Sequence, residues 1–225
     1  MKIIPEIDLK DGVVVHAQQG MREQYQPIST HLCQSSDIYQ VINAFLGVYE
    51  FDTIYIADLN AITHQGDHDQ LVRDVLTSFP DILFWIDSGY QRCKKYPSNH
   101  LPVLGSECYS DDTVLELKVF NNRFILSLDY SISETLGAKS LFSDQNLWPD
   151  SIIIMTLNRV GSNKGPDLDK LNWFCRQYPH KNFIAAGGIR DCADLLALKQ
   201  VGVQQALIAS ALHSGAIRRK DIKNL

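Results

Sequence analysis

Residues 3–12, IIPEIDLKDG, read as a short buried strand that carries one carboxylate, Asp8, to its C-terminal end. The Asp11-Gly12 pair predicts a turn, and residues 13–15, VVV, predict a second extended segment. Asp8 has two interpretations in this position. It can cap the loop by accepting backbone N–H bonds, or it can stand at the mouth of a parallel barrel, where enzymes of that fold keep their catalytic groups.

Apolar runs typical of strands alternate with helical patterns along the whole chain of 225 residues. Seven further strands are predicted, at residues 53–57, 82–86, 102–104, 124–128, 151–155, 183–186 and 205–208. Helices are predicted at residues 37–49, 67–79, 110–120, 166–178 and 191–199, with a short one near the end of the chain. Strands that alternate with helices form right-handed βαβ units and a parallel sheet. The pattern therefore predicts an α/β protein, a single (β/α)₈ TIM barrel over residues 1–225, at the small end of the size range of that fold.

The two halves of the chain match strand by strand, which predicts half-barrels at about residues 1–120 and 121–225. The strand that ends at Asp8 matches the strand that ends at Asp129. The other three pairs have offsets of 98, 100 and 104 residues, from Asp58 to Thr156, from Ser88 to Gly188 and from Ser106 to Ser210. Such similar offsets are hard to obtain from unrelated strands, so we expect two four-strand halves closed into one barrel.

Charge and composition argue against several classes of partner. The formal net charge is −5, and an acidic protein is a poor match for nucleic acid or an anionic membrane surface. No apolar run approaches the ~18 residues that a membrane span needs. The five cysteines are scattered without a CxxC motif, which is typical of reduced thiols in the cytosol. Met1-Lys2 leads directly into a strand, so we expect no signal peptide and a cytoplasmic protein.

The repeat places two carboxylates, Asp8 and Asp129, at equivalent strand ends. On opposite sides of one barrel mouth they can act at two positions of one substrate, one as a general base and the other as a general acid. That function requires environments that separate the pKa values of the two groups. The alternative is a pair of solvated loop carboxylates with no catalytic role.

Turns of small residues follow two predicted strands in each half of the chain. In the second half these turns contain Gly187, Gly188 and Ser210. The corresponding residues in the first half are Gly89, Gly105 and Ser106. Backbone N–H groups in such turns can approach an anion closely, and barrels frequently bind phosphate at the loops after strands seven and eight. Each turn alone can be an ordinary turn, but the pairing in the second half favours phosphate binding.

We expect no metal and no cofactor. His64 and His68 are four residues apart, but Gly66 lies between them in a predicted loop and no third ligand is evident. His213 follows the last strand and can simply cover the last turn. None of the cysteines lies in a motif that supplies a base, so a thiol nucleophile is not expected either.

These residues resemble a known family, the HisA/HisF phosphoribosyl-binding barrels of histidine biosynthesis. Residues 4–15, IPEIDLKDGVVV, with Gln19-Gly20 are similar to the opening signature of the family, and nearer to HisA than to HisF. Residues 56–61 (IADLNA), 165–168 (GPDL) and 187–190 (GGIR) also resemble HisA, whereas residues 209–213 (ASALH) are more similar to HisF. The resemblance covers essentially the whole chain.

The resemblance implies an Amadori-type aldose–ketose isomerisation with Asp8 as general base, Asp129 as general acid and Thr156 assisting. It also implies a small substrate with two phosphates. Gly187, Gly188 and Ser210 would hold one of them, with Gly89, Gly105 and Ser106 near the other. HisF-type ammonia chemistry would need a glutaminase partner, of which the sequence gives no independent sign, so we expect none.

Several residues depart from the HisA pattern. The triple glycine after the third strand of the family is Asp87-Ser88-Gly89 here, and a carboxylate in that cradle would repel a phosphate. The loop after residue 156 is short and lacks the Asp-Gly of HisA, and the segment after Asp129 lacks its glycine pair and tryptophan loop. These departures suggest a divergent branch with a changed substrate.

Three functions remain open. The first is a HisA-like isomerase that acts on a phosphorylated sugar or amino-sugar derivative. The second is a lyase, cyclase or isomerase in the biosynthesis of a one-carbon cofactor of the tetrahydromethanopterin type, which the resemblance alone suggests. The third is a non-catalytic barrel that binds a phosphorylated ligand, and the presence of both carboxylates and Thr156 disfavours it.

Overall fold

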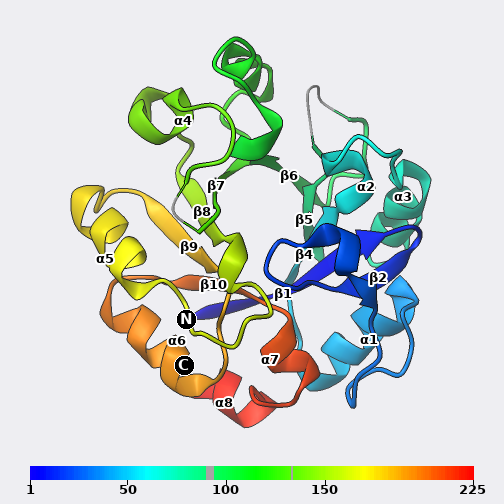
Figure 1. Ribbon diagram of the computed structural model, residues 1–225. Helices are drawn as coiled ribbons and strands as arrows, with labels where there is room; N and C mark the ends of the chain where they lie inside the picture. The colour runs from blue at the N-terminus through cyan, green and yellow to red at the C-terminus, as the bar shows by residue number, and fades with distance from the viewer. Residues whose placement is uncertain (90–93, 133) are drawn as a thin grey trace.

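Eight parallel strands form a closed barrel in the computed structural model, which describes residues 1–89, 94–132 and 134–225 (Figure 1). In chain order they are β1 (Lys2–Lys10), β4 (Thr53–Asp58), β5 (Leu83–Asp87), β6 (His100–Gly105), β7 (Ile125–Tyr130), β8 (Ser151–Thr156), β9 (Asn182–Ala186) and β10 (Gln205–Ile208). Each strand pairs with the next in this order, and β10 pairs with β1 to close the ring. The predicted fold, a single (β/α)₈ TIM barrel, is confirmed.

Helices surround the barrel on its outside (Figure 1). Four of them confirm predicted helices: α1 (Ile38–Val48), α3 (Asp69–Ser78), α5 (Leu168–Gln177) and α6 (Cys192–Gln200). An aspartate precedes three of these helices, and its side chain accepts a hydrogen bond from the backbone N–H three residues further on. Such caps satisfy a donor that has no partner within the helix, which is why the helices begin at these residues.

The other helices of the described residues are short. The α-helices among them are α2 (Leu59–Ile62), α4 (Ser140–Ser143), α7 (Ser210–His213) and α8 (Arg219–Lys223). The 3₁₀ helices are η1 (Arg22–Gln24), η2 (Ser106–Cys108), η3 (Val114–Phe120), η4 (Gln145–Leu147) and η5 (Leu157–Arg159). Several of them lie in the loops that follow the C-terminal ends of the strands, so they contribute to the barrel mouth.

The helix predicted at residues 110–120 is the 3₁₀ helix η3 instead of an α-helix. Its buried residues are Val114, Leu117 and Phe120, which are spaced three apart. That spacing matches the 3.0 residues per turn of a 3₁₀ helix and leaves Leu115 and Val119 exposed. The period of the apolar residues therefore explains the difference from the prediction.

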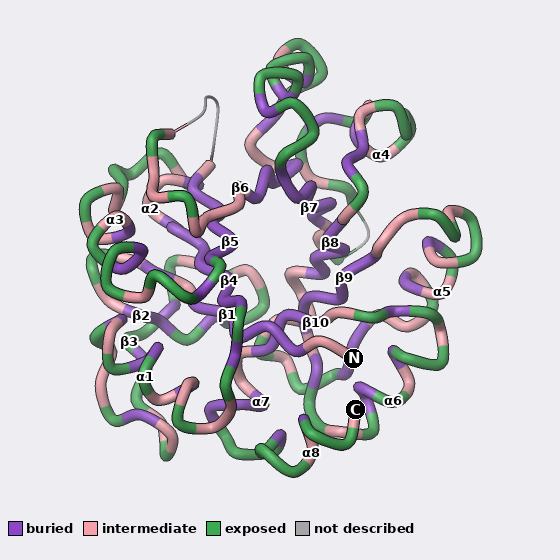
Figure 2. Tube along the Cα trace, turned by 180° about the vertical axis from the view of Figure 1, so that it is seen from behind, coloured by how far each residue is buried: buried purple, intermediate pink, exposed green. Residues whose placement is uncertain are grey.

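Side chains of the barrel strands alternate between two hydrophobic cores. The outer core lies between the strands and the helices and includes Ile7 of β1. The inner core fills the barrel and includes Ile4 of β1 and Tyr55 of β4. Figure 2 shows the strands as a ring of buried residues inside a partly exposed layer. The same alternation directs Glu6 and Asp8 of β1 into the barrel.

Two antiparallel strands, β2 (Val13–His16) and β3 (Gln26–Pro27), extend the sheet from β1. β2 contains the predicted extended segment and pairs with the C-terminal end of β1, with Asp8 opposite Val15. The 3₁₀ helix η1 lies in the loop between β2 and β3. This extension therefore brings residues after β2, Arg22 among them, to the mouth of the barrel.

The two chain ends lie side by side (Figure 1). The amino group of Met1 donates a hydrogen bond to the backbone oxygen of Leu225 at 3.2 Å. Within the ranges described above, no helix has both the length and the apolar character needed to cross a membrane. Cys33, Cys108, Cys175 and Cys192 are free thiols, and Cys93 lies outside the described residues.

Candidate active site

A small cavity of about 30 Å³ lies at the C-terminal ends of the barrel strands. Five carboxyl side chains and one guanidinium group are among the groups that line it: Glu6, Asp8, Arg22, Asp87, Glu107 and Asp129. We call it the acidic cavity. Asp8 and Asp129, the two carboxylates singled out in the sequence, both line this cavity and come from opposite halves of the barrel.

Asp129 is 4% exposed, and three donors hold its carboxylate. The Ser127 hydroxyl donates to Oδ1 at 2.6 Å, while the Ser106 hydroxyl and the Glu107 backbone N–H donate to Oδ2 at 3.1 and 3.2 Å. Ser106 Oγ in turn accepts a hydrogen bond from the backbone N–H of Asp129 at 2.9 Å. The side chain of Asp8, by contrast, forms no hydrogen bond with any described residue.

Asp87 approaches Asp129 from β5, and Gly105 lies against both. Asp87 Oδ1 accepts a hydrogen bond from the Gly89 backbone N–H at 3.3 Å, and Oδ2 accepts one from the Tyr55 hydroxyl at 3.5 Å. A Cβ on Gly105 would lie 3.2 Å from Asp129 Oδ2 and 3.3 Å from Asp87 Oδ2. A side chain at position 105 would therefore crowd the two carboxylates.

An ion pair between Arg22 of η1 and Glu107 of η2 joins two sides of the mouth. Arg22 Nη1 lies 2.9 Å from Glu107 Oε2, and Nη2 lies 2.5 Å from Oε1. Lys10 Nζ donates to the backbone oxygen of Arg22 at 2.9 Å, which ties η1 to the end of β1. A bidentate pair of this kind has a defined geometry as well as charge complementarity.

Burial raises the pKa of four carboxyl groups in the acidic cavity, to about 8 for Glu6 and Asp87 and to about 7 for Asp8 and Asp129. Neighbouring charges also contribute to these pKa values, in both directions. The Asp8 carboxylate further raises the pKa of Glu6, and the Asp129 carboxylate that of Asp87. The Arg22 guanidinium lowers the pKa of Asp8, whereas the Glu107 carboxylate raises that of Asp129.

A second, larger cavity of about 670 Å³ adjoins the acidic cavity, because Glu6 and Val160 line both. Its wall contains the three residues of the predicted second-half phosphate site, Gly187, Gly188 and Ser210. We call it the glycine-walled cavity. Its volume lies within the range of 300–1,000 Å³ that is usual for small-molecule sites, which the acidic cavity does not reach.

Gly187 and Gly188 can only be glycine in this backbone. Their φ angles are +97° and +84°, a region that residues with a side chain rarely adopt. A Cβ would also lie 2.7 Å from the backbone oxygen of Thr156 at position 187, and 2.4 Å from that of Gly165 at position 188. The chain therefore passes very close to its neighbours here and presents bare backbone to the cavity.

Basic and imidazole groups surround the glycine-walled cavity. Its lining includes Arg190, His16, His31 and His213, with Glu6 as its carboxylate. His16 Nε2 lies 3.4 Å from Ser210 Oγ. Burial and, to a lesser extent, His16 lower the pKa of His213 to about 4, so the His213 ring is neutral at pH 7. Arg190 is paired with Asp194 at 2.7 Å, so imidazole groups and bare backbone dominate this cavity, whereas carboxyl groups dominate the acidic cavity.

Thr156 does not join the two carboxylates in the structure. It is 4% exposed at the end of β8, but the lining of neither cavity includes it. Its neighbour Met155 lines the acidic cavity, because alternation along β8 turns Ile153 and Met155 into the barrel. An assisting role of Thr156 stays a prediction.

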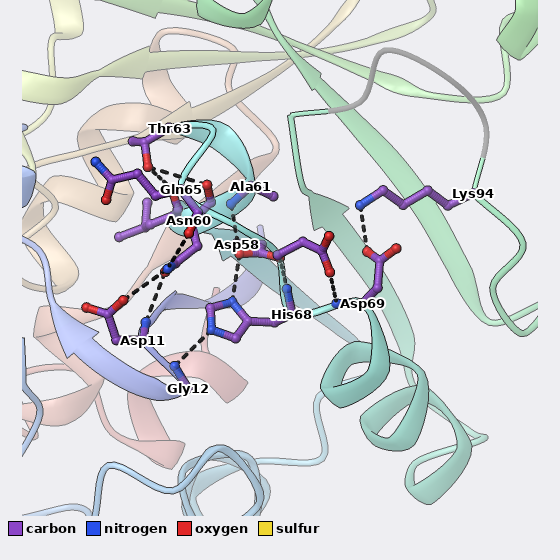
Figure 3. A network of polar contacts seen from close by, with 12 residues as sticks. Asp11, Gly12, Asp58, Asn60, Ala61, Thr63, Gln65, His68, Asp69 and Lys94 are labelled. Carbon is purple, nitrogen blue, oxygen red and sulfur yellow. Dashed lines mark hydrogen bonds and ion pairs between the residues drawn. The ribbon is translucent and has the colours of Figure 1, made fainter.

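His68 belongs to a structural network around Asp58 (Figure 3). The fully buried Asp58 carboxylate accepts hydrogen bonds from the backbone N–H groups of Ala61 and His68, at 3.2 and 2.8 Å. His68 Nδ1 lies 2.8 Å from Asp58 Oδ1, and His68 Nε2 accepts a hydrogen bond from the Gly12 backbone N–H at 2.8 Å. Both ring nitrogens of His68 are thus engaged, and His64 is exposed.

This network fixes the turn that follows Asp8. Asn60 contributes to it, because its side chain accepts from the Asp11 backbone N–H at 2.9 Å and donates to the Asp11 carboxylate at 3.0 Å (Figure 3). The β1–β2 turn is therefore attached to the loop after β4, and with it the C-terminal end of the strand that carries Asp8.

Three charged residues of the acidic cavity were not identified from the sequence: Glu6, Arg22 and Glu107. The sequence did indicate the position of Glu6, because Glu6 lies two residues before Asp8 on the same strand and alternation directs both side chains to the same face. Arg22 and Glu107 lie in loops with no periodic pattern, so no local signal was available for them.

The fold and the two cavities define a class of protein: a (β/α)₈ barrel with an acidic cluster and an open glycine-walled cavity at the C-terminal ends of its strands. The chain belongs to the histidine biosynthesis protein family, whose model matches residues 2–101 and 141–218. The resemblance to the HisA/HisF barrels is thereby confirmed.

Similar proteins cover nearly the whole chain. An uncharacterised protein of Methanocaldococcus jannaschii is 30% identical over 234 residues, which span 100% of this chain and 98% of the relative. Proteins of Vibrio cholerae and Listeria innocua are 24% and 23% identical, over 97% and 99% of this chain and 96% and 97% of their own. Both are named as isomerases of an imidazole-4-carboxamide that carries two phosphoribosyl groups.

Proposed function

We propose that the protein is an isomerase of a phosphorylated sugar or amino-sugar derivative, with Asp8 as general base and Asp129 as general acid. The observation that carries this proposal is that both carboxyls line one cavity next to a larger, glycine-walled one. The reacting carbons would lie where the two cavities adjoin, while the phosphate lies against Gly187, Gly188 and Ser210. The isomerase relatives support this reaction class.

The electrostatics of the acidic cavity support the two roles. Proton transfer is most efficient when the pKa of the catalytic group lies near the working pH, and both groups have a pKa of about 7. The Arg22 guanidinium favours the ionised form of Asp8, which a base needs. The Glu107 carboxylate favours the protonated form of Asp129, which an acid needs. In an Amadori-type isomerisation the acid gives its proton to the ring oxygen as the C1–O bond breaks and the ring opens. The base removes the proton from C2, and C1 gains a proton as the carbonyl forms at C2.

The experiment that tests this function is exchange of the C2 proton in D₂O, followed by ¹H NMR over a panel of aldose and amino-sugar phosphates. The wild-type protein should incorporate deuterium at C2 of an accepted compound. Asp8→Asn and Asp129→Asn should each slow the exchange or the net isomerisation by about 10²–10⁴-fold, the usual effect of losing a general acid or base.

Glu116→Gln is the matched control, because Glu116 is exposed on η3 and lines neither cavity. It should leave the rate unchanged. If both asparagine variants turn over an accepted substrate at the wild-type rate, the pair has no catalytic role. A protein that binds the phosphates without exchanging any C2 proton would be a binding barrel.

A further inference from the structure

The two cavities of the mouth differ in the groups that line them, although an ordinary two-phosphate ligand would need cations in both. The glycine-walled cavity is lined by one carboxyl group, Glu6, by imidazole groups and by Arg190, whose guanidinium Asp194 pairs at 2.7 Å. The acidic cavity has five carboxyl groups and one cation, Arg22, which Glu107 already pairs. A ligand that spans both cavities should therefore have an anionic end and an end that is not anionic.

The donors expected to hold a second phosphate are already bound to carboxylates of the protein. The Gly89 N–H donates to Asp87, and the Ser106 hydroxyl donates to Asp129. The Glu107 N–H also donates to Asp129. A phosphate could use these groups only by displacing a buried carboxylate, and it would then lie beside that charge at a repulsion on the order of 4 kcal/mol for 4 Å and an effective dielectric of 20.

Glu6 gives an independent indication of a ligand. It is 6% exposed, it lines both cavities, and its side chain has no hydrogen-bond or ion-pair partner among the residues that the structure describes. Buried polar side chains are nearly always hydrogen-bonded, because a missing partner costs about 1–3 kcal/mol. Tyr55 lies opposite Glu6 in the β1–β4 register and donates to Asp87. Glu6 and Asp87 thus both neighbour Tyr55 and line the same small cavity from two strands.

The size of the acidic cavity limits what can enter it. A volume of about 30 Å³ holds one water-sized group, for which roughly 10–15 Å³ is enough, and is too small for a phosphate with its four oxygens. A protonated amine has the size of a water molecule, carries three donors and accepts nothing. Ionised carboxylates, which only accept, are its natural partners.

We propose that Glu6 and Asp87 bind the protonated amino group of a substrate that carries one phosphate and one amine instead of two phosphates. Asp8 and Asp129 then remain free for the reacting carbons. This inference rests on the proposed function, because it takes the phosphate to lie at Gly187, Gly188 and Ser210. Burial raises the pKa of Glu6 and Asp87 to about 8, so both are mainly protonated at pH 7, and entry of the amine ionises them and releases protons to the solvent.

A matched pair of ligands tests this proposal: D-glucose 6-phosphate and D-glucosamine 6-phosphate, which differ by one hydroxyl and one ammonium group. Isothermal titration at pH 7 and low salt should give a Kd at least tenfold lower for the amine, about 1.4 kcal/mol. Titrations in two buffers of different ionisation enthalpy should show that only the amine releases protons beyond those released by the common phosphate. Fructose 1,6-bisphosphate should bind no more tightly than fructose 6-phosphate.

Two variants test whether the acidic cavity causes the tighter binding of the amine ligand. Glu6→Gln should reduce the amine preference at least threefold while inorganic phosphate binds as well as before or better. Asp87→Asn should act in the same direction and keeps the test valid if Glu6→Gln does not fold. Glu116→Gln, on the exposed face of η3, should retain the full preference.

The outcomes separate the two proposals. Tight phosphate binding without an amine preference, or a preference that survives in both variants, would overturn this inference and leave the proposed phosphate site intact. Uptake of Mg²⁺ alone that depends on Glu6 and Asp87 would also overturn it, in favour of a cation site. If neither inorganic phosphate nor any sugar phosphate binds, the proposed function fails and this inference fails with it.

Discussion

Arg22 Nη2 lies 2.5 Å from Glu107 Oε1, and this ion pair acts in opposite directions on the two carboxyls below it. Its positive end lowers the pKa of Asp8, and its negative end raises the pKa of Asp129. Asp8 is half-buried and Asp129 is buried, and both carboxyls have a pKa of about 7, so the charge of such neighbours is what distinguishes them. The pair therefore gives a physical basis for one base and one acid.

The first prediction separates the two ends of this ion pair. Arg22→Gln should raise the pKa of Asp8 more than that of Asp129, because Asp8 loses the cation that lowers its pKa. Glu107→Gln should lower the pKa of Asp129 more than that of Asp8, because a neighbouring negative charge is removed. Titration of ¹³C-labelled aspartate carboxyls by NMR measures both. Equal shifts of Asp8 and Asp129 in each variant would show that the pair does not distinguish them.

The second prediction concerns stability and pH. Unfolded carboxyls titrate near pH 4, whereas Glu6, Asp8, Asp87 and Asp129 titrate near 7 to 8 in the folded state. The folded state thus binds more protons between these values, so stability is greatest below about pH 4–5 as far as these groups are concerned and falls as pH rises toward 8. Each group contributes a slope of up to about 1.4 kcal/mol per pH unit. Thermal melts at pH 5, 6, 7 and 8 measure the fall in Tm.

Glu6→Gln provides the control for that slope. It removes one group that must ionise in the interior, so it should raise Tm at pH 8 and change it little at pH 5. Glu116→Gln, which is exposed, should follow the wild-type curve. A wild-type Tm that rises between pH 5 and pH 8 would mean that the four carboxyls are ionised at little cost.

The third prediction separates backbone strain from close packing at the glycine-walled cavity. Gly188 and Gly12 have φ angles of +84° and +81°, but a Cβ meets the Gly165 oxygen at 2.4 Å in the first and nothing within 4 Å in the second. Gly12→Ala should cost about 1–2 kcal/mol, the penalty of a left-handed backbone. Gly188→Ala should cost at least about 2 kcal/mol more, within the range of 1–3 kcal/mol or more for overpacking. Urea denaturation measures both, and equal costs would exclude the close approach.

The fourth prediction tests the network around Asp58. Asp58→Ala should cost about 3 kcal/mol or more in urea denaturation, because it leaves buried donors of Ala61 and His68 without a partner. Asp111→Ala is the matched control, since Asp111 also accepts two hydrogen bonds, from Ser140, but is exposed. It should cost about 1 kcal/mol or less. Similar costs for the two variants would show that the Asp58 network does not hold the turn after Asp8.

The sequence was sufficient for the fold because alternation of strands and helices repeats over the whole chain and leaves few other topologies. It was sufficient to place Asp8 and Asp129 at one cavity, because each lies at the end of a strand and closure of the barrel brings strand ends together. It was insufficient for Arg22 and Glu107, whose positions depend on how two aperiodic loops cross the mouth. Thr156 lies at the strand end where the sequence placed it, but which face of β8 it occupies depends on the phase of alternation, and its assisting role stays a prediction.

Two carboxylates of the protein occupy hydrogen-bond donors that could otherwise bind an anion. Asp87 accepts from Gly89, and Asp129 accepts from Ser106 and Glu107. These carboxylates are competitors tethered to the barrel, present at an effective concentration that a dissolved anion does not reach. Donors suited to an anion are therefore present but occupied from within. Substitution of Asp87 alone would free the Gly89 N–H for an anion. A change of one side chain could therefore change the class of ligand that this barrel binds.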